Sequence, residues 1–394
     1  MKKNFALMSL LALALMLVNC RRDDDIGPTK ARDYTDQYAK DLADIEQFLK
    51  THRYTVINNP GQQNDQDVTF HAVQDGDPRA IWFSDSLETR TVKTYRNQDK
   101  DIDYKMYFLR LRTGGGALND KPSPTNTDEI LASYTGKYLF HLSTVVDGTP
   151  VDSLKYFEFE SNPFPQANLD LQQTIKGWGE IFPQFKGGDA TQIDGQPTTY
   201  GNFGAGVMFI PSALGYYNQA LGSIPAYAPL IFTFKLYSVT RTDTDGDGIP
   251  NYLEDLDNDG YMYIILNEDG TGDPRPDDID GDGAPNYLDQ DDDGDNVLTI
   301  EELRRPQVEI SPGVYDYTKY YYKFNGAAVD DPNTPYDDRL GAPRCLNGPT
   351  DSQCNATGSF EDFTEPTRLR NYLDPNCTKV NRWVSAGQTP APCN

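Results

Sequence analysis

Two stretches of the chain place acidic residues at alternate positions, a spacing that suits the binding of a hard cation. The first begins at Asp243, continues through Asp245 and Asp247, and ends at Glu254, with glycine at loop position 6. In such a loop, oxygens at positions 1, 3, 5, 9 and 12 and a backbone carbonyl at position 7 can surround Ca²⁺ with six or seven ligands. The second stretch repeats the pattern from Asp278. We therefore predict metal binding in this region.

Each acidic loop continues into a second one, which extends the set of predicted ligands. In the first copy, with Ile249 acting through its main-chain carbonyl, the ligands are Asp243, Asp245, Asp247, Ile249, Asn251, Glu254, Asp255, Asp257 and Asp259. In the second copy, with Ala284 acting through its carbonyl, they are Asp278, Asp280, Asp282, Ala284, Asn286, Asp289, Asp291, Asp293, Asp295, Thr299 and Glu302. The copies lie about 35 residues apart and form an internal repeat. They resemble thrombospondin type 3 repeats, which have almost no apolar core and fold around calcium.

The alternative for this region is a disordered acidic linker, since so few apolar residues cannot bury enough surface to order a chain. Random acidity would not reproduce the spacing with glycine at position 6 in both copies. Without an ion the crowded carboxylates would repel one another, so metal binding here is expected to drive folding. Calcium fits better than magnesium, which accepts fewer protein oxygens.

A second group of residues forms an ordered series of aromatic and apolar segments. These are Glu129–Tyr138, Val151–Ser153, Asn162–Phe164, Gln173–Trp178, Phe209–Tyr216 and Ala228–Phe232. Together they resemble the FK506-binding (FKBP) family of peptidyl-prolyl isomerases. The resemblance implies an α+β fold, in which an antiparallel half-barrel wraps around one short helix. It also implies that the Trp at the start of that helix forms the floor of an apolar proline pocket.

The resemblance implies a role for each matched side chain. Trp178 would be the floor, Tyr216 would donate a hydrogen bond to a substrate carbonyl, and Asp152 would set the polarity at the twisting bond or orient its neighbours. The walls and flap of the pocket would be Tyr134, Phe164, Ile175, Phe232 and, on the flap, Ile224. The chain departs from the family at Val151, where a Phe is usual, and at Tyr217, where a Gly is usual. Tyr200 is a weaker match than Tyr216 for the flap tyrosine.

Such a pocket needs no nucleophile or proton donor. Rotation of an X-Pro bond faces a barrier of about 18–20 kcal/mol, because the twisted amide loses its resonance. The twisted amide is less dipolar than the planar one, so a dry aromatic site favours it by differential binding. This agrees with a chain that has only three His residues and no recognisable catalytic triad. The plainer interpretation is that the aromatic residues only form a core.

The elements expected around these sites follow from hydrophobic periodicity. Apolar residues at spacings of three and four from Asp33 to Lys50 predict an amphipathic helix that packs on the barrel. Alternating patterns predict strands at 68–73, 80–83, 89–95 and 104–112, the last being the first barrel strand. We therefore divide the chain into a signal peptide (1–20), a tether (21–32), a helix with a β insertion (33–102), an isomerase domain (103–240), repeats (243–304) and a C-terminal region (305–394).

Charge and the N-terminus restrict the partners and the location. The net charge of −25 argues against a nucleic-acid partner. Residues 243–302 contain 21 acidic residues and one basic residue, so the acidity is local. A basic start and an apolar run from Phe5 to Val18, ending in Leu-Val-Asn-Cys20, resemble a bacterial lipoprotein signal in which Cys20 carries the lipid. The acidic run after Cys20 resembles the export signal of surface lipoproteins in Bacteroidota-type bacteria. An ordinary signal peptide with a chance cysteine is the alternative.

The remaining cysteines lie near the C-terminus and suit disulfides in an exported protein. Cys345, Cys354, Cys377 and Cys393 allow three pairings, whereas zinc lacks support from a Cys-x-x-Cys motif or a nearby His. Taken together, the sequence predicts a lipid-anchored outer-membrane prolyl isomerase that acts on proline-containing polypeptides. One alternative is a non-catalytic FKBP-like scaffold or chaperone subunit of an outer-membrane translocation or assembly complex. Another is a calcium-dependent adhesin.

Overall fold

The computed structural model describes residues 31–97, 100–256, 258, 260–262 and 277–303, and short pieces at 309–311, 314–315, 344–345, 361–362, 370–373 and 375. Contacts divide the chain into Met1–Asp33 and Tyr34–Asn394, and the following description concerns the second unit. Cys20, Asp257, Asp259 and three of the four C-terminal cysteines lie outside the described residues, so lipidation and disulfide pairing stay predictions. In the described part of the chain, no helix is both long and apolar enough to cross a membrane.

The predicted amphipathic helix is confirmed as α2 (Tyr34–Thr51). Its buried face carries Ile45, Phe48 and Leu49, which recur at helical spacing and pack onto the sheet. The chain then forms the hairpin of β1 (His52–Val56) and β2 (Val68–Ala72). The predicted strand at 80–83 is wrong, because Ile81–Phe83 forms a short 3₁₀ helix that places Ile81 in the core.

The central element is a seven-stranded sheet whose strands all pair in antiparallel fashion. The order along it is β3-β4-β10-β11-β5-β6, and the short β7 also pairs with β5. The strands are β3 (Leu87–Asn97), β4 (Lys100–Arg112), β5 (Glu129–Val146), β6 (Thr149–Asn162), β7 (Leu169–Asp170), β10 (Gly204–Ile210) and β11 (Leu230–Thr240). Since β3 pairs with β4, the segment we assigned to a β insertion and the segment we assigned to the isomerase domain share one sheet.

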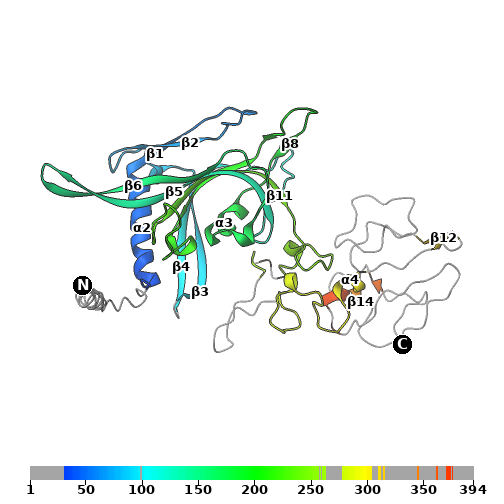
Figure 1. Cartoon of the computed structure of the whole chain (residues 1–394). Coiled ribbons are helices and arrows are strands. Elements are labelled where there is room, and N and C mark those ends of the chain that lie inside the picture. Colours follow the sequence, from blue (N-terminus) through cyan, green and yellow to red (C-terminus); the bar gives the residue numbers. More distant parts are fainter. Residues whose placement is uncertain are drawn as a thin grey trace, which may run out of the picture. The chain divides into compact units, whose positions relative to one another are not determined.

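The two faces of the sheet bury two separate cores, because successive strand residues point to opposite faces. On one face, Phe108, Met208 and Phe232 pack with the short helix α3 (Lys176–Ile181). On the other face, Phe209 and Ile231 pack with α2. Figure 1 shows the sheet curving around α3. The predicted α+β fold, an antiparallel half-barrel around one short helix, is confirmed.

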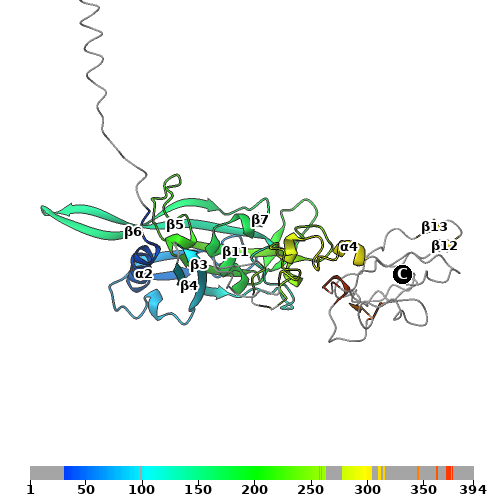
Figure 2. The ribbon, with the colours of Figure 1, turned by 90° about the horizontal axis from the view of Figure 1, so that it is seen from below.

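Strands β5 and β6 form a long hairpin whose strands exceed the other strands of the sheet in length. Its pairing runs without interruption from Gly136 and Glu160 to Val146 and Thr149, apart from one register shift next to Gly136. Figures 1 and 2 both show its tip extending beyond the neighbouring strands. The register of this hairpin matters for the site, because it decides which residues of β6 lie beside Tyr134 and Phe232.

The other described elements are short. Between α3 and β10 the chain forms β8 (Asp189–Thr191) and β9 (Thr199–Gly201), which pair with each other. Among the described residues of the acidic region, the helical elements are the small helix α4 (Thr299–Glu302) and short 3₁₀ turns, such as those at Asn251–Leu253 and Asn286–Leu288. The remaining strands are β12 (Glu309–Ser311), β13 (Val314–Tyr315), β14 (Arg344–Cys345) and β15 (Glu361–Asp362). Tyr372 and Leu373 are buried against Ile249 and Leu303, so C-terminal residues complete the core of the acidic region.

Candidate functional site

The indole of Trp178 stands at the centre of an aromatic cluster in the concave face of the sheet. Its ring meets Tyr134 edge-on at a centroid distance of 4.9 Å, and Phe232 at 5.1 Å. Trp178 is 5% exposed, and its Nε1 is buried without a hydrogen-bond partner. Tyr134, Ile175 and Tyr216 are half-buried around the same core. The sheet and helix thus bring these predicted residues together, although they come from four separate segments.

Phe159 of β6 completes the aromatic set, and sequence reasoning missed it. Its ring packs edge-on against Phe232 at 5.6 Å and is half-buried. The approach of these two rings depends on Gly136, where an added Cβ would lie 2.5 Å from Phe159 Cζ and 2.8 Å from Phe232 Cε1. A side chain at position 136 would therefore displace one of the rings.

A polar edge borders the aromatic cluster. The Tyr134 hydroxyl donates a 2.8 Å hydrogen bond to the Glu160 carboxylate. Burial, and then the Glu160 carboxylate, raises the pKa of Tyr134. The same two causes raise the pKa of Tyr216. Both phenols therefore remain protonated at neutral pH and can act as hydrogen-bond donors beside one carboxylate.

The segment after β10 brings Tyr216 and Ile224 to this core. Ile224 is 4% exposed, and its backbone bonds to Leu221 close the turn that carries it. Tyr217 has φ of +48°, a left-handed conformation that glycine adopts without strain. Its ring stacks on Tyr34 of α2 at 4.0 Å, a contact that a glycine would lack. Tyr200, the weaker match for the flap tyrosine, instead stacks on Tyr237 at 4.5 Å.

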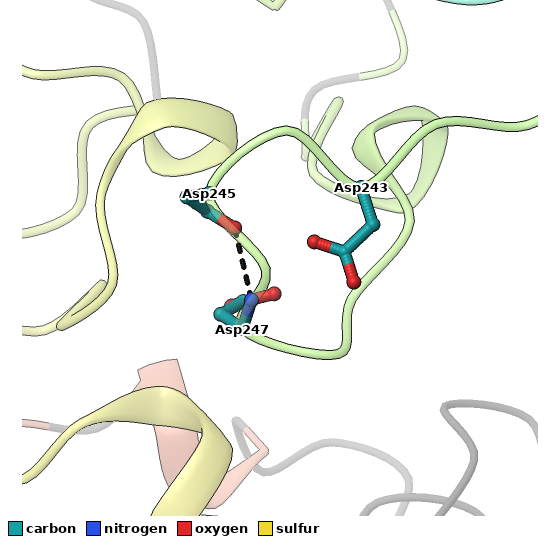
Figure 3. Close-up of side chains that lie close together, drawn as sticks. All are labelled: Asp243, Asp245 and Asp247. Carbon is teal, nitrogen blue, oxygen red and sulfur yellow. Dashed lines mark hydrogen bonds between the residues drawn. The ribbon is translucent and has the colours of Figure 1, made fainter.

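The first acidic loop is wound around its own carboxylates. Asp243 accepts hydrogen bonds from the backbone N–H groups of Gly246 and Gly248, and Asp245 accepts one from Asp247. Figure 3 shows the three carboxylates turned toward the inside of the loop. One ligand oxygen from each of these three residues lies within 4.8 Å of the others.

The same hydrogen-bond pattern returns in two further loops. In the loop from Asp278, that residue accepts from Gly281 and Gly283, and Asp280 accepts from Asp282. In the loop from Asp291, that residue accepts from Asn296, and Asp293 accepts from Asp295. Each loop again gathers three carboxylates within 4.8 Å. Loop geometry of this kind can hold a cation that prefers oxygen.

Comparison with known proteins identifies two regions. The chain is 32% identical over 124 residues to the FKBP-type peptidyl-prolyl cis-trans isomerase FkpA of Aeromonas hydrophila, a match that covers 32% of this chain and 36% of that protein. About a third of the chain is homologous to an FKBP-type isomerase. The chain thus spans little more than a third of that relative's length. Residues 243–336 match the family described as BamM C-terminal.

Two solved isomerase structures are also similar. One is a peptidyl-prolyl cis-trans isomerase of Pseudomonas syringae pv. tomato, with 20% identity and a TM-score of 0.23, covering 34% of this chain and 76% of that one. The other is FkpA of Escherichia coli, with 19% identity and a TM-score of 0.23, covering 38% and 51%. The FKBP homology therefore rests on the sequence match.

The structure does not bring Asp152 to the aromatic cluster of the FKBP-like region. Asp152 pairs with Ser143 toward the tip of the long hairpin, nine residues along β5 from Tyr134, or about 30 Å. There its carboxylate bonds His141 Nδ1 at 2.7 Å, and His141 Nε2 bonds Asp44 of α2 at 2.9 Å. We therefore correct the assignment: Glu160, within Phe159-Glu160-Ser161, holds the place expected of Asp152. This second Phe-acid-Ser triplet was the sequence signal that could have found it.

Phe164 is also placed away from the cluster. Its side chain is 63% exposed and lines a separate hollow with Tyr200 and Tyr237. Phe159 takes the wall that we predicted for Phe164, and it also supplies the aromatic ring that Val151 seemed to lack. Val151 is 41% exposed on the distal hairpin, beside Asp152.

Three of the predicted metal ligands also brace the loops through hydrogen bonds, and their role as ligands stays a prediction. Asn251 Oδ1 accepts from the backbone N–H of Thr244 at 2.9 Å, and its Nδ2 donates to the Thr244 hydroxyl. Asn286 Oδ1 likewise accepts a hydrogen bond from the backbone N–H of Ile279, and Thr299 Oγ1 accepts one from the backbone N–H of Asp292. In each loop the side chain at position 9 thus accepts the backbone N–H at position 2, which stabilises the curvature of the loop.

The other predicted ligands are placed as follows. Asp255 accepts from Gly260, and Asp289 Oδ1 accepts from Asp291, so both belong to the same loop framework. Ile249 and Ala284 donate their N–H groups to Asp247 and Asp282, a geometry compatible with a ligand role for their carbonyls. Glu302 is 1% exposed at the end of its loop. Asp292, which sequence reasoning passed over, is buried beside Asp247 and Glu254.

The buried acids fit a cation better than they fit a protein without one. Both carboxylate oxygens of Glu254 are buried without a hydrogen-bond donor. Burial, and then the neighbouring carboxylates led by Asp292, raises the pKa of Glu254 to about 11. Burial likewise raises the pKa of Asp247 to about 8. A buried carboxylate with no donor is costly, so a positive ion is the natural partner for these groups.

Proposed function

We propose that the chain is a peptidyl-prolyl cis-trans isomerase that acts on X-Pro bonds of exported proteins. The single observation that carries this proposal is the ring cluster of Trp178, Phe232, Tyr134 and Phe159 in the curve of the sheet. Homology with an FKBP-type isomerase supports the same conclusion. Such a cluster offers the apolar floor and walls that a proline ring needs.

The chain's residues would lower the barrier by binding the twisted amide more tightly than the planar one. The aromatic rings favour the less dipolar twisted bond, since they exclude water from it. Tyr216, whose pKa is raised, keeps its proton and can donate to a substrate carbonyl. Tyr134 is oriented by its bond to Glu160, which lines the polar edge of the cluster.

A protease-coupled proline assay on the full-length protein tests the proposal. We expect Trp178→Leu to lower kcat/KM at least tenfold, because the floor of the pocket is lost. Trp82→Leu is the matched control, since Trp82 packs on Tyr107 of the opposite core. Thermal melting identifies a folding defect, in which case Tyr134→Phe replaces the first variant. Equal activity of the wild type and both pocket variants would rule out the isomerase.

We also propose that the loops from Asp243, Asp278 and Asp291 bind Ca²⁺ as a structural ion. The three carboxylate groups within 4.8 Å and the donor-free Glu254 support this. The bound ion would supply positive charge that holds the loops folded and would take no part in isomerisation. Chelation is expected to lower the melting temperature of the acidic region while the half-barrel stays folded, and calcium should restore it. An identical melting curve with chelator and with calcium would contradict the proposal.

A lipid on Cys20 would anchor the protein to the outer membrane, and the acidic run after Cys20 favours the cell surface over the periplasmic face. The support is the signal-like segment that ends at Cys20. Mass spectrometry of the mature N-terminus tests lipidation, and Cys20→Ala should release the protein from membranes. Protease treatment of intact cells distinguishes the two faces.

A second candidate function is a non-catalytic subunit of an outer-membrane assembly complex. The match of residues 243–336 to the BamM C-terminal family favours it. In that case the protein would purify in fixed proportion with membrane partners, and pocket variants would have no phenotype. Purification of the Trp178→Leu protein from the native membrane, followed by the proline assay, separates the two functions.

A further inference from the structure

Asp292 breaks the pattern of its own loop. Counted from Asp291 it occupies position 2, where the earlier loops have Thr244 and Ile279. In all three loops the backbone N–H at this position bonds the position-9 side chain, at 2.9, 3.1 and 3.2 Å. The backbone of the third loop therefore needs no carboxylate here, and the acid calls for another explanation.

The side chain of Asp292 lies against the first loop. One of its carboxylate oxygens is within 4.8 Å of ligand oxygens of Asp247 and Glu254, and all three side chains are 1% exposed. A second contact joins the same loops, since Gln290 Nε2 donates to the Asp245 carbonyl at 2.6 Å across 45 residues. The third loop is therefore packed on the first one by polar contacts.

The carboxylate oxygens of this cluster that accept no hydrogen bond require a positive charge beside them. Both oxygens of Glu254, both of Asp292 and Oδ2 of Asp247 are buried and accept no hydrogen bond. Five such oxygens in one buried cluster would carry a large electrostatic penalty unless a cation lies among them. A divalent ion that prefers carboxylate oxygen meets this requirement.

We propose that Asp247, Glu254 and Asp292 form a divalent cation site shared between the first and third loops. The proposal rests on calcium binding by the loops and extends it: the ion is held by two repeats at once. It would fasten the third loop and α4 to the first loop, next to the small core of Ile249 and Leu303. Folding of the two repeats then becomes cooperative, because neither one completes the site alone.

Calcium titration of the chelator-treated full-length protein tests the shared site, with Asp292→Thr as the variant. Threonine is the residue that the first loop already holds at this position, so the loop backbone is kept. We expect Asp292→Thr to weaken one calcium-binding step by about tenfold or more, as Glu254→Gln should, since each removes a charged ligand. The double variant should be no weaker than the stronger single one. Asp282→Asn, in the loop from Asp278, is the matched control and should add independently.

The melting temperature with and without calcium is a second measurement. If Asp292 only stabilised the fold, its substitution would lower the melting temperature in both conditions. With calcium, Asp292→Thr should have a lower melting temperature than the wild type, because one charged ligand is gone. With chelator it should have a higher melting temperature, because one buried and unpaired charge is gone. Coupling of Asp292→Thr to Asp295→Asn but not to Glu254→Gln would assign Asp292 to its own loop and overturn the shared site. Unchanged calcium binding by Asp292→Thr would overturn it as well, and both results leave the calcium loops standing. Absence of any calcium binding by the wild type would instead remove the loops and the shared site together.

Discussion

The hydrogen bond between Tyr134 and Glu160 distinguishes two assignments of the acidic residue beside the aromatic cluster. The structure favours Glu160, whose carboxylate accepts from the Tyr134 hydroxyl at 2.8 Å. Asp152, the residue favoured by the sequence match, bonds His141 on the distal hairpin. Substitution of Glu160 should therefore lower isomerase activity, whereas substitution of Asp152 should leave it almost unchanged.

The expected loss of activity is estimated from the strength of the hydrogen bond between Tyr134 and Glu160. A hydrogen bond to a charged group contributes about 1.5–3 kcal/mol, and the exposure of Glu160 places this one at the lower end. A loss of about 1.4 kcal/mol in transition-state binding lowers kcat/KM by about tenfold. We expect this for Tyr134→Phe, which removes the donor and keeps the ring. Glu160→Gln keeps an acceptor and should cost about threefold to fivefold.

The protease-coupled assay measures these changes, with circular dichroism to verify folding. The Tyr134→Phe/Glu160→Gln double variant should resemble Tyr134→Phe, because both changes remove one interaction. Asp152→Asn should stay within about twofold of wild type, since the structure places it about 30 Å along the strand from Tyr134. If Asp152→Asn lost activity while Glu160→Gln kept it, the strand register used here would be wrong.

Two further predictions concern stability. Asp41 of α2 accepts from Ser212 N at 2.7 Å and from its hydroxyl at 2.6 Å, and burial, with a smaller contribution from Asp44, raises its pKa from 3.8 to about 6. The native state therefore binds this proton more tightly than the unfolded state does, and the contribution of Asp41 to the unfolding free energy falls by about 3 kcal/mol as pH rises from about 4 to 6. Denaturant melts of the wild type and of Asp41→Asn should differ by an unfolding free energy that follows this slope. A difference that does not change with pH would refute the prediction. Tyr217→Gly and Tyr217→Ala both lose the ring stack on Tyr34, but only glycine relieves the backbone strain at φ +48°. The Gly variant should therefore be more stable than the Ala variant by about 1 kcal/mol in denaturant melts. Equal stability of the two variants would argue against backbone strain at this position.

The sequence by itself determined the features whose parts lie close together along the chain. The acidic loops were predictable because position 1 to position 12 is one short segment, and the carboxylates of Asp243, Asp245 and Asp247 converge as expected. The amphipathic helix was predictable for the same reason, since its buried face repeats with the helical period. The homology was visible from the order of the matched segments around Trp178.

Tertiary structure decided the features that depend on register and on contact between distant segments. Two Phe- or Val-acid-Ser triplets lie on one strand, and only the pairing of Gly136 with Glu160 shows which of them lies beside Tyr134 and Phe232. Position 9 of the loops carries oxygen in every copy, but only the structure shows that this side chain also accepts the backbone N–H at position 2, as Asn251 does from Thr244. Asp292 reaches Glu254 across a fold between repeats that no local spacing encodes. In each case the chemistry depends on which side chains meet in space, which only long-range packing determines.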